Sequence, residues 1–378
     1  MTQVRRRIYV LDGSVAVTGA FVSAREMARA LRHDADVVLV LPDTAQIAAT
    51  DLTDFSAVHR LPIRPLRRTL RDAAIYLPCL LHAALRLRWL MVRDGADTLF
   101  VNDFYLMQGP FLRLLGYRGR LVTWVRIDPA IFGQVGRLWL WLASRASDRI
   151  ISVSRHIQRL LPGAMPSVLL HNPVSAEFLP RPPPRETGRF EFVFVGNYIE
   201  GKGQDVALTA LAEVLKTVPE ARLRFHGGDM GLAKNSAYRC SLEMQAERLG
   251  VAEAVSFNDF APSPRAALEG AFASLNLSKS ESFSRTVLEA SASGLPVIAT
   301  RCGGPEEIIE DGLTGIMIPV GDSSACAEAM RMLCYNRDLA ARMGDAGRQR
   351  VMQVFAPDTF TERLRALIEE AAMPEQKD

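Results

Sequence analysis

The chain has 378 residues, more than one hydrophobic core usually serves, so two domains are expected. Its composition, 48% hydrophobic and 23% charged, excludes a disordered or fibrous protein. The five cysteines form no CxxC pair and the six histidines do not cluster, which predicts a reduced cytosolic protein with no metal site.

The net charge of +3 conceals an asymmetry between the two halves. Residues 1–188 contain 25 arginines and no lysine against 15 acidic residues, a balance of +10, whereas residues 189–378 contain 20 basic and 27 acidic residues, a balance of −7. The first half is therefore a candidate for meeting an anionic surface. An arginine-rich coding bias is the alternative, because arginine outnumbers lysine by 40 to 5.

The first half begins with a strand-like run, RIYVLDG at 7–13, followed by a helical pattern at 20–32. IYVLDG is too short for the apolar region of a signal peptide. Further buried-strand patterns follow, with helical stretches between them, and this alternation predicts an α/β domain with a parallel sheet. These strand patterns are DVVLVLP (36–42), DTLFVND (97–103), RLVTWV (120–125) and DRIISVS (148–154).

Arginines and apolar residues follow one another between residues 60 and 92. Five arginines stand at offsets 0, 4, 7, 8 and 11, which predicts one basic helical face. One proline, one histidine and two arginines interrupt the apolar stretch 75–92, so we do not expect it to span a membrane. Basic and apolar residues at helical spacing favour a peripheral position on an anionic membrane, at its inner face; a solvated face beside a core helix is the alternative. No nucleic-acid recognition motif accompanies the charge. The arginines are Arg60, Arg64, Arg67, Arg68 and Arg71.

Four prolines within five residues, at 180 and 182–184, predict a linker over 181–188 between a first domain, 1–180, and a second, 189–356. The alternation then resumes, so the second domain is also α/β, and an amphipathic helix over 357–373 is expected to pack back on the first domain. Ligands of open parallel sheets bind at the carboxyl ends of the strands, so a cleft between the domains is the expected site. The strand patterns of the second domain are FEFVFVG (190–196), RLRFHGG (222–228), AVSFND (254–259), ASLNLS (273–278), PVIAT (296–300) and TGIMIPV (314–320).

The first strand of the second domain opens into a glycine loop, VGNYIEGKGQD. Gly196, Gly201 and Gly203 allow a tight turn, and Lys202 precedes a helix whose first N–H groups favour an anion. This arrangement indicates a phosphate site, although the loop is neither a Walker motif nor GxGxxG. A surface lysine in a plain loop is the alternative.

The stretch ESFSRTVLE places Glu281 in a loop and Glu289 in the second turn of a helix that begins near Ser284. The N–H groups of residues 283–286, up to Thr286, lie between the two carboxylates. One ligand with a phosphate and two sets of hydroxyls, as in a nucleotide sugar, would suit this layout. GLPVIATRCGGPEEII adds a Gly303-Gly304 loop as a second backbone cradle.

ESFSRTVLEASASGLPVIATRCGGPEEIIEDGLTGIMIPVGD and VGNYIEGKGQDVALTAL resemble the family 4 retaining glycosyltransferases (glycosyl transferases group 1), and the similarity covers 190–355. The resemblance implies the GT-B fold, with two Rossmann-like domains facing a central cleft, and a nucleotide-diphosphate sugar, UDP- or GDP-linked, as donor. It implies transfer with retention and no cofactor. Glu289 would bind the ribose, Glu281 the transferred sugar and Lys202 the pyrophosphate.

The same resemblance places Phe283, Ser284 and Arg285 along the phosphate turn, with Ser284 where the family often has glycine. Asn197, next to Gly196, stands where the family usually has arginine. Arg285 could then supply the missing charge to the departing pyrophosphate.

The first domain gives weaker signals. Asp128, in TWVRIDPAIF, is a candidate for contact with the acceptor or, equally, a helix cap. The loop that ends at Gly19 would approach the donor or serve only as a turn. Asn102 and Asp103 follow a strand and have the same two interpretations.

Three functions remain open at this stage: transfer of a sugar to a lipid-linked or polysaccharide acceptor, epimerisation of a nucleotide sugar, and binding by a relative that has lost activity. Asn197 motivates the third.

Overall fold

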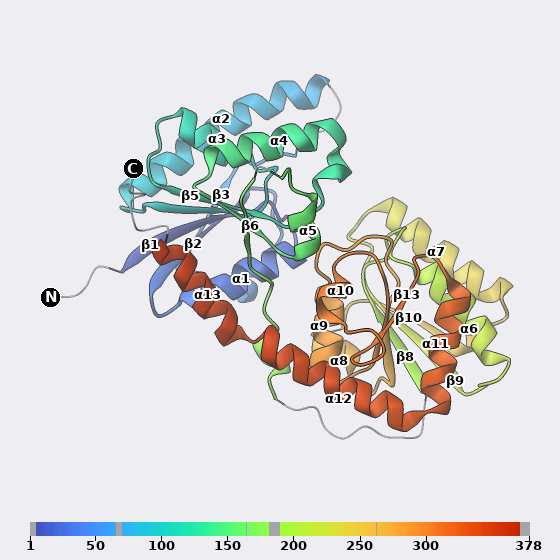
Figure 1. Cartoon of the computed structure of the whole chain (residues 1–378). Coiled ribbons are helices and arrows are strands. Elements are labelled where there is room, and N and C mark those ends of the chain that lie inside the picture. Colours follow the sequence, from blue (N-terminus) through green and yellow to red (C-terminus); the bar gives the residue numbers. More distant parts are fainter. Residues whose placement is uncertain (1–4, 66–69, 164, 181–189, 262, 371–378) are drawn as a thin grey trace. The chain divides into compact units, whose positions relative to one another are not determined.

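The computed structural model describes residues 5–65, 70–163, 165–180, 190–261 and 263–370. The chain forms two compact units, Met1–Pro173 with Pro357–Asp378, and Val174–Ala356 (Figure 1). The chain therefore enters the second unit after residue 173, seven residues before the end expected for the first domain. The expected linker, 181–188, lies outside the described residues.

The sheet of the first unit is parallel throughout, in the order β3-β2-β1-β4-β5-β6-β7. Side chains of β1 alternate between its two faces, as a strand dictates: Ile8 and Val10 join one core, and Tyr9 and Leu11 join the other. The strands are β1 (Arg6–Leu11), β2 (Ala35–Pro42), β3 (Ala57–Leu61), β4 (Thr98–Val101), β5 (Arg120–Val125), β6 (Arg149–Ser152) and β7 (Val168–Leu169).

Helices cover both faces of this sheet. Residues of α1 and α13 belong to one core cluster, and residues of α2 and α3 belong to the other. In α13, Phe360 stacks on Trp124 with ring centroids 6.3 Å apart, and Arg365 pairs with Asp34 at 2.7 Å. The helices are α1 (Gly19–Leu31), α2 (Leu70–Arg93), α3 (Gln108–Leu114), α4 (Gly133–Ala146), α5 (Arg155–Leu160) and α13 (Pro357–Glu370), with 3-10 turns η1 (Ala49–Leu52) and η2 (Pro129–Phe132).

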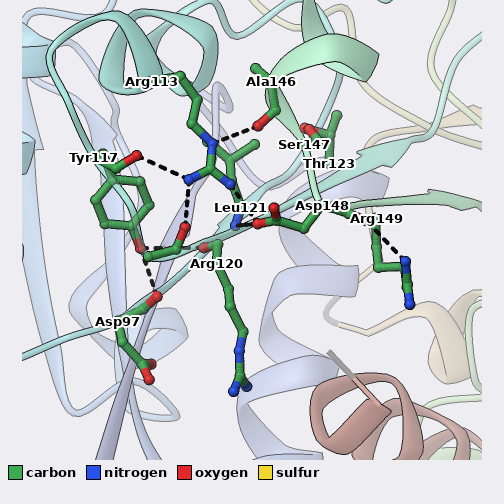
Figure 2. A network of polar contacts seen from close by, with 11 residues as sticks. Asp97, Arg113, Tyr117, Arg120, Leu121, Thr123, Ala146, Ser147, Asp148 and Arg149 are labelled. Carbon is green, nitrogen blue, oxygen red and sulfur yellow. Dashed lines mark hydrogen bonds and ion pairs between the residues drawn. The ribbon is translucent and has the colours of Figure 1, made fainter. Parts of the chain in front are cut away.

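A polar network centred on Arg113 fastens α3 to the end of α4 and the start of β5 (Figure 2). Its guanidinium donates to the carbonyl of Ala146 at 2.7 Å and to that of Tyr117 at 3.0 Å, and it pairs with Asp148. Asp148 in turn accepts the N–H of Leu121 at 2.8 Å. Because one half-buried charge binds several carbonyls, α3 and α4 are held in a fixed position over the sheet.

The predicted basic helical face over 60–71 is wrong in its first part. Arg60 lies in the edge strand β3 and donates to the carbonyl of Ala45, and Arg64 lies in the following loop and pairs with Asp43. Both charges are thus engaged within the unit, while residues 66–69 lie outside the described residues.

The second unit has a parallel six-stranded sheet in the order β10-β9-β8-β11-β12-β13. Its strands are β8 (Phe190–Val195), β9 (Ala221–His226), β10 (Val255–Asn258), β11 (Ala273–Asn276), β12 (Val297–Thr300) and β13 (Ile316–Ile318). Its helices are α6 (Gln204–Leu215), α7 (Ala233–Arg248), α8 (Pro264–Leu268), α9 (Arg285–Ala292), α10 (Pro305–Ile308), α11 (Ser323–Tyr335) and α12 (Arg337–Val354), with 3-10 turns η3 (Ala176–Phe178) and η4 (Ala252–Ala254).

Candidate functional site

The glycine loop after β8 is clamped to the loop after β11, because these two strands are neighbours in the sheet. The backbone of Lys279 donates to the carbonyl of Gly201 at 2.8 Å. Gly203 has φ +89, and a Cβ on it would lie 2.2 Å from the carbonyl oxygen of Leu277. Glycine is thus required here both for the left-handed backbone and for the close approach, which places Lys202 beside the second loop.

Lys202 and Glu281 form an ion pair, with Nζ 2.7 Å from Oε1. Ser278 donates its hydroxyl to the same oxygen, also at 2.7 Å. The side chains of Lys202 and Glu281 are 33% and 17% exposed, so the pair is reachable from solvent but held in place. The two residues that the sequence assigned to different parts of one ligand therefore touch each other.

The N-terminus of α9 follows Glu281 in the sequence, and side-chain hydroxyl groups form its hydrogen bonds. Ser284 is the cap and accepts the N–H of Val287 at 3.4 Å. Asn276, at the end of β11, donates to Ser284 Oγ at 3.2 Å and to Thr286 Oγ1 at 3.0 Å. Phe283 packs its ring against Phe355, with centroids 5.7 Å apart, so its side chain serves the core and its backbone belongs to the turn.

Arg285 and Glu289 form a second pair on α9, with Nε 3.7 Å from Oε1 and side chains 13% and 10% exposed. Arg285 also donates to the hydroxyl of Ser175 at 3.0 Å. The arginine that was predicted to face a phosphate is thus also bound to the carboxylate predicted to hold the ribose.

The Gly303-Gly304 loop runs alongside Glu281. The N–H of Gly304 donates to the carbonyl of Glu281 at 2.7 Å, and a Cβ on Gly304 would lie 2.7 Å from the backbone of Phe283. The N–H of Gly303 donates to the carboxylate of Glu306 at 2.8 Å. This loop therefore supports the Glu281 backbone, and both N–H groups expected to form a cradle are already used by the protein itself.

Asn197 contributes backbone rather than side chain to the glycine loop. Its carbonyl accepts from the carboxamide of Gln204 at 2.9 Å, and its buried Oδ1 has no hydrogen-bond partner among the described residues. Gln204, fully buried at the start of α6, was not singled out from the sequence. Its position directly after the last glycine of the loop was the available signal.

In the first unit, Asp128 is a cap: it accepts the N–H of Ala130 at 2.8 Å at the start of η2. Gly19 is the first residue of α1, whose cap is Thr18; Thr18 Oγ1 accepts the N–H of Phe21 at 3.2 Å and lies 2.7 Å from the hydroxyl of Ser14. Asp128 thus caps a helical turn and Gly19 begins a helix, so each has a local structural role. Contact of either residue with a ligand stays a prediction.

A buried polar cluster occupies the carboxyl edge of the first sheet, where β1, β4 and β5 end. Arg126 lies over the Trp124 ring at 3.8 Å and donates to Asn102 and, at 3.0 Å, to Asn172. Asp12 binds Asn102. Asn102 was a candidate site residue from the sequence, whereas Asp12 and Asn172 were not. Asp12 could have been recognised, because it directly follows the first strand as Asn102 follows the fourth.

Residues 175–350 match the family described as glycosyl transferases group 1. The chain is 34% identical over 183 residues to the D-inositol 3-phosphate glycosyltransferase of Corynebacterium jeikeium, across 47% of this chain and 42% of that protein. It is 29% identical over 289 residues to the GDP-mannose-dependent alpha-(1-6)-phosphatidylinositol monomannoside mannosyltransferase of Mycolicibacterium smegmatis, across 69% of this chain and 72% of that protein.

Residues 175–350, just under half of the chain, are similar to the glycosyl transferases group 1 family. The predicted resemblance to this family is confirmed. Both ion pairs, the glycine loop and the α9 N-terminus lie within the matched segment. The chain spans less than half the length of the inositol phosphate glycosyltransferase from C. jeikeium.

Solved structures extend the likeness to the whole chain. HepE of Anabaena in complex with UDP and glucose matches with a TM-score of 0.81 at 19% identity, covering 97% of this chain and 100% of that one. Sucrose-phosphate synthase of Thermosynechococcus elongatus matches with a TM-score of 0.82 at 17% identity, covering 98% and 100%. At these identities the likeness establishes the fold, and the predicted GT-B class, with two parallel-sheet α/β domains, is confirmed.

Asp103, beside the polar cluster in the first unit, predicts that the stability of this unit depends on pH. Burial raises the pKa of Asp103 from 3.8 to about 7, although its carboxylate accepts the backbone N–H groups of Phe104 and Arg126. Because the folded pKa is above the unfolded one, the stability associated with this group is present at low pH and is lost as pH rises from about 4 to about 7. Asp103→Asn should therefore raise the melting temperature at pH 8 and change it less at pH 5.

Thermal unfolding of the wild type and Asp103→Asn over this pH range measures the effect. Asp51→Asn, at a half-buried ion pair with Arg25, serves as a control for removing a carboxylate from the same unit. A melting-temperature difference between Asp103→Asn and wild type that stays constant with pH would show that Asp103 is ionised in the folded protein throughout.

Proposed function

We propose that this chain is a retaining glycosyltransferase that moves a sugar from a UDP- or GDP-sugar to a lipid-linked or polysaccharide acceptor at the cytoplasmic face of a membrane. The Lys202–Glu281 pair carries the proposal, because it joins the loop suited to a pyrophosphate with the residue suited to a sugar, at 2.7 Å. The names of relatives point the same way: among them are a phosphatidylinositol mannoside mannosyltransferase and a lipopolysaccharide core glycosyltransferase of Rhizobium meliloti.

In this proposal each residue acts through charge and position. Lys202 and the N–H groups at the start of α9 bind the pyrophosphate, and Glu289 accepts hydrogen bonds from the ribose. Glu281 binds hydroxyls of the transferred sugar while its Oε1 remains fixed by Ser278. No cofactor takes part, and no cluster of His, Cys, Asp and Glu suited to a metal occurs among the residues that the structure describes.

The bond from the anomeric carbon to the phosphate oxygen breaks as a bond from the acceptor oxygen to the same carbon forms. The proton of the acceptor hydroxyl passes to an oxygen of the departing phosphate, so the nucleotide diphosphate leaves with that proton. Attack from the face that the phosphate leaves gives retention. Negative charge grows on the pyrophosphate during this step, and Lys202 is positioned to stabilise it.

Incubation with UDP- and GDP-sugars, with and without membrane lipids or polysaccharide as acceptors, tests the proposal. Release of nucleotide diphosphate only with an acceptor, and a product with the donor's anomeric configuration by NMR, are expected. Isomerisation of the donor alone would indicate an epimerase instead. Saturable binding of the donor without any turnover would indicate a relative that has lost activity.

Asn197→Arg should leave the rate of transfer unchanged or raise it. The substitution places a cation at the loop position next to Gly196, where extra positive charge would stabilise the departing pyrophosphate. Steady-state rates of the wild type and Asn197→Arg measure this, with Asn336→Arg, at the cap between α11 and α12, as a control for added charge. A strong loss of activity in Asn197→Arg alone would mean that the side chain at 197 does not face the phosphates.

A further inference from the structure

Helix α2 is apolar on two sides, and only one side is buried. Its inner side packs into the core under the sheet, through Leu80, Ala83, Leu87, Leu90 and Met91. Its outer side exposes Ile75, Leu77, Leu81, Leu85, Trp89 and Val92, four of which recur at every fourth position. A helix that is hydrophobic all round is normally covered on all sides, so the outer side is suited to a partner that supplies the missing cover.

Helix α4 continues this exposed surface. Val135, Leu138 and Trp141 of α4 are exposed, and so is Ile131 in the preceding turn η2. Helix α3 contacts both α2 and α4 (Figure 1). Its Leu114 is exposed as well. The three helices cover the same face of the first sheet, and the Arg113 network fixes α3 against α4 (Figure 2). We call the exposed apolar residues of these helices and of Ile131 the α2–α4 surface.

Arginines are stacked on the two exposed tryptophans of this surface. The guanidinium groups of Arg86 and Arg93 lie 4.4 and 5.0 Å from the ring centre of Trp89, and that of Arg145 lies 5.3 Å from the ring centre of Trp141. The tryptophans are 49% and 51% exposed. Arg93 is also paired with Asp94 at 2.7 Å, but neither 74–93 nor 131–146 itself contains an aspartate or glutamate. The surface therefore combines apolar side chains with positive charge, as surfaces at a lipid–water boundary do.

We propose that the α2–α4 surface docks on an anionic lipid bilayer, with the apolar side chains below the headgroups and the arginines among the phosphates. The inference deepens the proposed position at a membrane, but lipid binding does not depend on sugar transfer. The residues 74–93 are long and apolar enough to cross a membrane, yet the inner side of α2 belongs to the core of the first unit. Crossing would remove that core from the sheet, so the helix lies on the bilayer.

A second copy of the chain fits this surface less well. Two copies meeting face to face would bring Arg86, Arg137 and Arg145 of one against the same arginines of the other, with no acidic residue within 74–93 or 131–146 to pair them. Like charges brought together cost free energy, whereas an anionic bilayer supplies the complementary charge.

Sedimentation of the full chain with vesicles, in the absence of any donor sugar, tests the proposal. Vesicles of phosphatidylcholine with about one third phosphatidylglycerol should bind the wild type, and pure phosphatidylcholine vesicles should bind it much less. Trp89→Ala with Trp141→Ala should weaken binding to the anionic vesicles by about tenfold, because two side chains lose their burial in the bilayer. Arg86→Gln with Arg145→Gln should weaken it most at low salt.

The control is Met332→Ala with Tyr335→Ala, which removes two exposed apolar side chains of α11 in the second unit and should leave vesicle binding unchanged. Melting temperatures confirm that each variant is folded. Quenching of tryptophan fluorescence by brominated lipid, lost in the double tryptophan variant, would locate the contact. The proposal would be overturned if the wild type did not bind the anionic vesicles at low salt, or if the tryptophan variant bound them as well as the wild type does. It would also be overturned if the chain left the vesicles unbound and instead formed a concentration-dependent dimer that the tryptophan substitutions abolish. Vesicle binding is measured without nucleotide release. A negative result would therefore overturn the proposed lipid contact and leave the proposed sugar transfer to be tested by the release assay.

Discussion

Lys202→Ala is expected to lower the rate of sugar transfer by about 10²–10³, the usual scale for losing one donor that stabilises a transition state. Lys202 is the cation of the glycine loop, and the loop geometry, with its required glycine at 203, aims it at Glu281. Donor affinity should fall less than the rate does, because negative charge on the pyrophosphate is greater in the transition state than in the ground state. Single-turnover kinetics with saturating donor separates the two effects.

Lys279→Ala is the matched control, because Lys279 is an exposed lysine in the loop that is clamped to Gly201. Its rate should remain at the wild-type value. A folded Lys202→Ala protein with a near-normal rate would show that the glycine loop is not a phosphate site, and the similarity to the family would then describe the fold and not this mechanism. Arg285→Ala is expected to cause a loss of similar order.

Glu289→Ala should weaken binding of the cognate nucleotide diphosphate by about 10- to 100-fold, because hydrogen bonds to a charged group contribute roughly 1.5–3 kcal/mol. The carboxylate is 10% exposed and already positioned by Arg285, so little ordering is needed when the ribose binds. Titration calorimetry with UDP and with GDP measures the affinity and identifies the base.

Two further variants separate binding from folding. Glu289→Gln keeps the shape and one acceptor oxygen, and its affinity should lie between those of the wild type and Glu289→Ala. Glu213→Ala removes an exposed glutamate paired with Lys216 on α6 and should bind as the wild type does. If Glu289→Ala has a lowered melting temperature but unchanged affinity, Glu289 only anchors Arg285.

Sequence patterns predicted the central strands and the edge strands β10 and β13 of the second sheet, but they missed the edge strands β3 and β7 of the first. Strands such as DVVLVLP are covered on both faces and read as continuous apolar runs. The edge strand β3, AVHRL, pairs on one side only and is largely half-exposed, so it carries no such run. Arg60 was consequently assigned to a helix, although it lies in a strand.

The composition of the candidate site was predictable, but its pairing was not. Lys202 and Glu281 are 79 residues apart in the chain, and they meet because β8 and β11 are adjacent. Local patterns predict the strands but not their order in the sheet. Lys202 and Glu281 were therefore assigned to the pyrophosphate and to the sugar, although their side chains contact each other. The pair on α9, in contrast, follows from its i, i+4 spacing and could have been anticipated.

The return of α13 to the first unit has a consequence for how the protein is made. Phe360, Leu364 and Leu367 complete the core beneath β1 and β2, yet they are synthesised after the entire second unit. Residues 174–356 are contiguous, and their two ends are joined by a hydrogen bond of 2.9 Å from the N–H of Val174 to the carbonyl of Phe355. On the ribosome, the usual order of folding from the N-terminus is therefore reversed: the second unit can close during translation, while the first must wait with part of its core uncovered until α13 emerges.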